Sequence, residues 1–144
     1  MVNSVNISIL IPLLPMGITL FILILLVSFN RTINRLTKPV TALLIISLLS
    51  SAIISSFNYF KKIEGELFLS NYLKFFESTN LVLHLSELSE RIIILFSLIM
   101  TVLIGTFFYK LPRQKGYVAL MVAIGLISSS IIFTILLIDF SNFI

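Results

Sequence analysis

The sequence predicts an all-α integral membrane protein in which four helices cross the bilayer and an outward-facing irregular loop separates the second helix from the third. Four uncharged, strongly apolar runs lead to this prediction, because each supplies roughly the 20 residues that a helix needs to span the hydrocarbon core. Hydrophobic residues make up 58% of the 144-residue chain and charged residues only 11%, whereas soluble domains carry about a quarter charged residues. The runs cover residues 1–30, 39–60, 92–109 and 116–138.

We expect a single membrane domain over residues 1–144. The chain has no cysteine and one histidine, so disulfides, iron–sulfur clusters and histidine-rich metal sites are excluded. No motif for phosphate binding, nucleophilic catalysis or metal binding is present, so we predict no cofactor and no catalysis by this chain alone. The helices are expected at about 8–29, 39–59, 88–109 and 116–138, with the loop at 60–87.

The first helix is expected to begin near Ile11 or Pro12 and not to be a cleaved signal peptide. The residues before it carry no positive charge, and the apolar run is longer than the core of a secretory signal. Pro12 and Pro15 then lie near the start of the helix, where the missing N–H of proline costs no hydrogen bond.

Positive charges predict which helix ends face the cytoplasm. The loops after the first and third helices contain lysine and arginine but no acid, and a four-helix chain puts both loops on one side. The positive-inside rule assigns that side to the cytoplasm, so that the other side faces the periplasm or the lumen of an internal membrane. Since these cations flank the spans, the net charge of +4 does not indicate nucleic-acid binding. The topology-determining residues are Arg31, Arg35 and Lys38 in the first loop and Lys110, Arg113 and Lys115 in the third.

The loop between the second and third helices carries five acids and four basic residues over positions 61–91, which suits the outward side. Within it, residues 67–76 suit a short amphipathic segment on the membrane surface, and residues 81–85 suit an extended segment. Ser86, with acids in the turn that follows it, predicts the start of the third helix at about Glu87, because a serine cap and early acids favour a helix N-terminus.

A charged side chain at membrane depth is expensive and is a functional candidate by default, but the span centres contain none. Asp139, at the outer end of the fourth helix, is a candidate for proton relay through a larger partner, or simply an interfacial acid. His84 is a candidate pH sensor or a partly buried interface residue. Glu87 lies about one turn from Glu90, and such acids bind a cation, pair with Arg91 or only favour the helix start.

Several short segments in the second half of the chain resemble a known family. They are residues 83–89 (LHLSELS), residues 109–118 (YKLPRQKGYV), the serines at 128–130 and Asp139. With them the chain resembles the N-terminal part of the antiporter-like subunit of complex I, nearest the F subunit of the cyanobacterial and plastid NAD(P)H–quinone oxidoreductase. In that family an L-x-x-D-x-L-S stretch opens the third helix, and a loop that ends in Gly-Tyr opens the fourth.

The resemblance implies a membrane component of a complex I-like NAD(P)H–quinone oxidoreductase, an electron-transport enzyme, in a bacterial inner membrane or a cyanobacterial thylakoid. The family's acid before helix three falls on Ser86 here, and Ala119 and Leu120 replace the residues usual after Gly-Tyr. The Trp-Glu pair that follows the family's Asp and the functional lysines of its later helices have no counterpart in this sequence. We therefore expect a non-catalytic subunit or accessory component whose partners are the lipid bilayer and a larger membrane complex.

The alternative is a stand-alone small four-helix membrane protein, such as a scaffold, an assembly factor or a small transporter component; a fragment of a longer gene product is a third reading. The fourth helix carries Gly125 and the serines at 128–130, and such small residues let another helix approach closely. We expect a helix of a larger partner to cover them.

Overall fold

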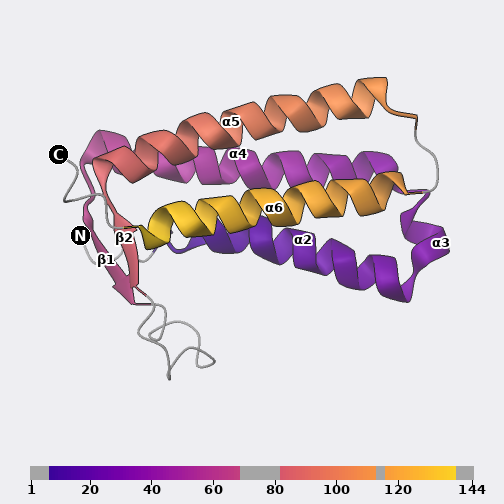
Figure 1. Cartoon of the computed structure of the whole chain (residues 1–144), viewed down its shortest axis with the longest axis horizontal. Coiled ribbons are helices and arrows are strands. Elements are labelled where there is room, and N and C mark those ends of the chain that lie inside the picture. The colour runs from indigo at the N-terminus through magenta and orange to yellow at the C-terminus, as the bar shows by residue number, and fades with distance from the viewer. Residues whose placement is uncertain (1–6, 69–81, 113–115, 139–144) are drawn as a thin grey trace.

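The computed structural model describes residues 7–68, 82–112 and 116–138 of the chain. Within these ranges, four long helices run up and down beside one another (Figure 1). Each is long and apolar enough to cross a membrane, so the protein has the all-α, four-helix membrane fold that the sequence predicts. The helices are α2 (Leu10–Ser28), α4 (Thr37–Lys61), α5 (Glu87–Lys110) and α6 (Tyr117–Leu137).

Helix α4 occupies the centre of the arrangement. It packs against α2 and α5 and also touches α6, while α2 and α6 pack against each other. Helix α5 lies on the outside, mainly against α4, with much of its apolar surface exposed. Because lipid is as apolar as these side chains, the helices are held together by close packing and interhelical hydrogen bonds rather than by a hydrophobic effect between them.

Pro15 lies inside α2 rather than in its first turn, because the helix begins at Leu10. A proline inside a helix removes the N–H that would bond to the carbonyl four residues earlier, here that of Ile11. Ser51 of α4 donates its hydroxyl to this carbonyl oxygen at 2.7 Å. A side chain from the neighbouring helix thus satisfies the backbone group that the proline leaves open, as a bilayer requires.

The small residues of α6 pack inside the bundle, so the expectation that an outside helix covers them is wrong for most of them. A Cβ atom on Gly125 would lie 2.3 Å from Thr19 Cγ2 and 3.0 Å from Leu44 Cδ2. Ser128 and Ser129 are buried as well. Because Gly125 has no side chain, α2 and α4 can approach α6 closely at this position. The sequence pattern alone did not reveal which helices would do so.

The loop between α4 and α5 is more regular than expected, because it contains an antiparallel strand pair at the end of the bundle (Figure 1). Strand β1 (Gly65–Phe68) pairs with β2 (Val82–Leu85), so that Gly65 lies opposite Leu85 and Phe68 opposite Val82. The extended conformation predicted near residues 81–85 is confirmed for residues 82–85.

The expected amphipathic segment at 67–76 lies largely outside the described residues. Its first two residues, Leu67 and Phe68, belong instead to β1, where Leu67 is buried and Phe68 is exposed. Leu83 and Leu85 of β2 are buried as well, so the hairpin packs its apolar side onto the rest of the structure.

The opposite end of the bundle holds the connections predicted to be cytoplasmic (Figure 1). The short helix α3 (Asn30–Ile33) joins α2 to α4 there, and α5 ends there too. Arg31, Arg35, Lys38 and Lys110 are exposed at this end, whereas Arg113 and Lys115 lie outside the described residues. The shared end agrees with the expected layout, and its assignment to the cytoplasm stays a prediction.

Candidate functional site at the hairpin end

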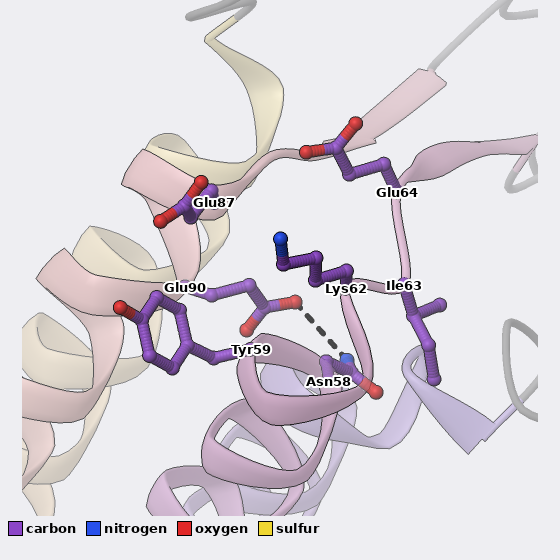
Figure 2. Close-up of a pocket in the computed structure, with 7 residues that line it drawn as sticks. All are labelled: Asn58, Tyr59, Lys62, Ile63, Glu64, Glu87 and Glu90. Carbon is purple, nitrogen blue, oxygen red and sulfur yellow. Dashed lines mark hydrogen bonds between the residues drawn. The ribbon is translucent and has the colours of Figure 1, made fainter.

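The candidate site forms where α4 ends, and its first wall is the turn that follows this helix. Lys62 adopts a left-handed conformation with φ of 50°. Its N–H bonds to the Tyr59 carbonyl at 3.2 Å, and the Ile63 N–H bonds to the Asn58 carbonyl at 3.0 Å. This is the usual way to satisfy the last carbonyls of a helix, but glycine normally takes the left-handed position. The turn directs the Lys62 side chain over the site (Figure 2).

The second wall is the first turn of α5, which a capping box fixes as the sequence predicts. The Ser86 hydroxyl accepts from the Ser89 N–H at 3.2 Å, and the Ser89 hydroxyl accepts from the Ser86 N–H at 3.0 Å. The helix therefore begins at Glu87. Three residues later, Glu90 points inward between the helices, while Glu87 stays at the rim.

Glu90 is the buried acid of the site, with only 1% of its surface exposed. Its Oε1 accepts a 3.0 Å hydrogen bond from the side-chain amide of Asn58, and the same amide also donates to Ser8 Oγ at 2.8 Å. The other carboxyl oxygen, Oε2, is buried without a hydrogen-bond partner in the described part of the chain. Ser55 lies beside this carboxyl, and its buried hydroxyl makes no hydrogen bond of ordinary length there.

A second buried hydroxyl, that of Ser97, lies farther along α5. Ser97 Oγ is buried and has no partner within the described residues, like Ser55 Oγ and Glu90 Oε2. Ser97 follows Glu90 by seven residues, about two helical turns, and so lies on the same face of α5. Buried polar groups almost always have partners, and each exception calls for an explanation such as a water molecule or an ion. Here the exceptions gather on α4 and α5.

Above Glu90 lies a small pocket of about 210 Å³, a volume that includes its open mouth. Figure 2 shows Lys62 reaching into its middle, between Glu64 and Glu87. Arg91 forms an ion pair with Glu87 and stacks near the Tyr59 ring. The pocket is lined by Asn58, Tyr59, Lys62, Ile63, Glu64, Glu87 and Glu90.

The structure places two of the three residues that the sequence singled out, and it puts them in different pairs. Glu87 pairs with Arg91 at the pocket rim. His84 lies on β2, partly buried, with its Nδ1 3.7 Å from Glu66 Oε1 on the neighbouring strand. Asp139 lies outside the described residues. Glu87 and His84 therefore belong to neighbouring parts of one end of the bundle but not to one cluster.

The residue that sequence reasoning did not single out is Glu90, which was considered together with Glu87 as an acid that binds a cation, pairs with Arg91 or only favours the helix start, and whose burial was not foreseen. Asn58 was the signal that could have found it. A side-chain amide inside an apolar run needs a partner, and the third helix returns antiparallel to the second with Glu90 at the matching height. The described residues contain no group of three or more His, Cys, Asp or Glu side chains placed to hold a metal ion.

Comparison with protein-family models, curated proteins and solved structures finds no match to this chain. Its function must therefore be inferred from its residues and their geometry.

Proposed function

We propose that the chain is a non-catalytic membrane subunit or accessory component of a complex I-like NAD(P)H–quinone oxidoreductase. The observation that carries the proposal is where the family-like segments lie. Ser86 caps α5, and Gly116 precedes α6 with φ of 97°, a conformation that favours glycine. In the family, the corresponding stretches open the third and fourth helices, so the resemblance and the helix starts coincide.

The Tyr of the Gly-Tyr pair also has a defined role in this bundle. The Tyr117 hydroxyl lies 3.0 Å from Thr41 Oγ1, and this buried hydrogen bond joins α6 to α4. The resemblance on which the proposal rests therefore involves residues with specific conformations and contacts, and not apolar composition alone.

Helix α5 offers the surface on which a neighbouring subunit would pack under this proposal. Its outer face is exposed and apolar, including Leu95, Ile99 and Val102. Gly105 has open space where a side chain would project, which permits the close approach of a second helix. Gly17 on α2 is equally open and serves as the matched control position.

The proposal is tested by affinity purification of the tagged chain from membranes solubilised in mild detergent, followed by native electrophoresis and identification of co-purifying proteins. We expect oxidoreductase subunits to be enriched, with a loss of about tenfold in Gly105→Leu and no loss in Gly17→Leu. A folded chain that migrates alone, with no oxidoreductase subunit above the level found with an unrelated four-helix membrane protein, would overturn the proposal.

The second candidate is a stand-alone four-helix membrane protein: a scaffold, an assembly factor or a small transporter component. It is favoured by the hydrogen bonds that α4 makes to other helices through Thr41, Ser51 and Asn58, since these join the bundle without help from a partner. Migration as a folded monomer would favour this candidate. Proton or sodium flux into liposomes that disappears in Asp139→Asn would select its transporter form.

A further inference from the structure

The pocket above Glu90 contains a feature that neither of these functions uses. Glu90 is almost completely buried, yet only one of its carboxyl oxygens has a hydrogen-bond partner in the described residues. The Ser55 hydroxyl beside it is buried and unpartnered as well. A carboxyl oxygen on α5 and a hydroxyl on α4 therefore lie beside each other without a hydrogen bond of ordinary length, although leaving even one buried polar group unsatisfied is unfavourable.

The charges around this place are not balanced. The pocket brings together the carboxylates of Glu64, Glu87 and Glu90, and the cations within reach are Lys62 and Arg91. Three acids against two cations give a formal balance of −1. Arg91 is committed to Glu87, which leaves Lys62 facing two carboxylates. Lys62 forms no ion pair with either one in the described part of the chain.

We propose that the pocket binds one monovalent cation, a proton or a sodium ion, on the Glu90 carboxylate beside Ser55, and that Lys62 competes with it. A single positive charge cancels the formal imbalance, and it supplies Glu90 Oε2 with the hydrogen-bond partner that it lacks among the described residues. The Lys62 side chain lies between Glu64 and Glu87 (Figure 2), so its ammonium group repels an arriving cation and lowers the affinity of the site for that cation. The site does not depend on the function proposed above.

The groups that line the site come from the end of α4, the turn after it and α5, and the hairpin lies at the same end of the bundle. The end of α4 and the turn after it supply Tyr59, Lys62 and Glu64, and α5 supplies Glu87 and Arg91. The hairpin carries Glu66 and His84, which pair with each other away from the pocket lining. Over their described lengths, α2 and α6 contain no charged residue. Among the described residues, a response to cations at this end must therefore come from a small set of side chains.

The experiment measures the thermal unfolding midpoint of the purified full chain in nanodiscs. One series replaces choline chloride with sodium chloride at constant ionic strength, and the other varies pH from mildly acidic to mildly basic. A cation that binds only the folded state raises its stability. We expect the midpoint to rise with sodium if the ligand is sodium, or with falling pH if the ligand is a proton.

Glu90→Gln is the decisive variant, because a glutamine oxygen still accepts from Asn58 while the charge is gone. We expect it to abolish the response, and Glu66→Gln, which removes a carboxylate at the same end but outside the pocket, to retain it. In Lys62→Gln the apparent affinity for the cation should rise about tenfold, since a nearby like charge is removed. Infrared spectra identify a bound proton by a protonated-carboxyl band that is absent from Glu90→Gln.

A wild-type midpoint that responds to neither sodium nor pH would overturn the proposal, and so would a response that survives in Glu90→Gln. If Glu90→Gln does not fold, Lys62→Gln decides instead: an affinity equal to that of the wild type would exclude competition by Lys62 and with it the proposed site.

Discussion

The side-chain amide of Asn58 on α4 donates a 3.0 Å hydrogen bond to the Glu90 carboxyl on α5. Both residues are almost fully buried, and they lie 32 positions apart in the sequence. Since both side chains are buried and an unpaired buried polar group is costly, the pair helps to set the register in which α4 and α5 pack. The Asn58 amide also donates a 2.8 Å hydrogen bond to Ser8 Oγ, which connects the segment before α2 to the same pair.

Removal of one partner of the Asn58–Glu90 pair should destabilise the protein by more than the net contribution of one hydrogen bond, because the other partner stays buried and unsatisfied. We expect Asn58→Leu to lower the free energy of unfolding by about 1–3 kcal/mol, because Glu90 is left buried without a donor. In the double variant Asn58→Leu/Glu90→Met the cost should fall short of the sum of the single costs by roughly 0.6–1.7 kcal/mol. Unfolding in mixed detergent micelles measures all three, and strictly additive costs would contradict the coupling.

Gly125 should not tolerate even the smallest side chain. Its Cβ would lie 2.3 Å from Thr19 Cγ2, so we expect Gly125→Ala to destabilise the bundle by about 1–3 kcal/mol. Thr19→Ser removes that methyl group and should restore part of the loss. Gly105→Ala is the control, because nothing lies within 4 Å of its Cβ position, and alanine there should stabilise α5 by up to about 1 kcal/mol. Equal effects at the two glycines would refute the close approach.

Ser51 and Pro15 should be coupled through the Ile11 carbonyl. Ser51→Ala removes the 2.7 Å hydrogen bond to that carbonyl and is expected to cost about 1 kcal/mol. In a Pro15→Ala background the same change should cost less, because the new N–H can bond to Ile11 within α2. Thermal unfolding of the four proteins provides the comparison, with Ser50→Ala as the control on the neighbouring position. A cost of Ser51→Ala that is the same in both backgrounds would argue against this coupling.

Glycine at position 62 should relieve backbone strain and so stabilise the folded protein, because Lys62 adopts a left-handed conformation. A left-handed conformation costs a non-glycine residue about 1–2 kcal/mol, and Lys62 adopts it with φ of 50°. We expect Lys62→Gly to raise the free energy of unfolding by about 1 kcal/mol relative to Lys62→Gln, which removes the same charge but keeps the strain. A glycine variant that is no more stable than the glutamine variant would show that this turn is not strained.

The predicted orientation can be tested with single cysteines, because the chain has none of its own. Thr32→Cys and Pro112→Cys lie at the exposed, basic end of the bundle, and Glu64→Cys lies at the hairpin end. The positive-inside rule predicts that an impermeant maleimide labels only the last of these in intact cells. Labelling of Thr32→Cys and Pro112→Cys alone would reverse the orientation, and labelling of just one of these two would disprove the four-span arrangement.

The positions of the four helices could be predicted from the sequence because a membrane span is a local property. A helix in a bilayer satisfies its own backbone, so an apolar run of sufficient length is enough to locate it. The start of α5 could be predicted for the same reason, because it depends on contacts between Ser86 and Ser89, which are three residues apart. No helix end differs from its expected position by more than two residues, as the bounds of α4 at Thr37 and Lys61 show.

Only the tertiary structure decided how polar and small residues are used. The sequence gives Glu87 and Glu90 the same local role, yet one pairs with Arg91 at the rim and the other is buried against Asn58. From the sequence, Gly125 was likewise expected to contact a helix of a partner, whereas in the structure Thr19 of α2 covers it. These outcomes depend on which helix faces lie against each other, and therefore on contacts between residues far apart in the chain. Hydropathy and charge patterns describe only residues that are close in sequence, so they do not predict such contacts.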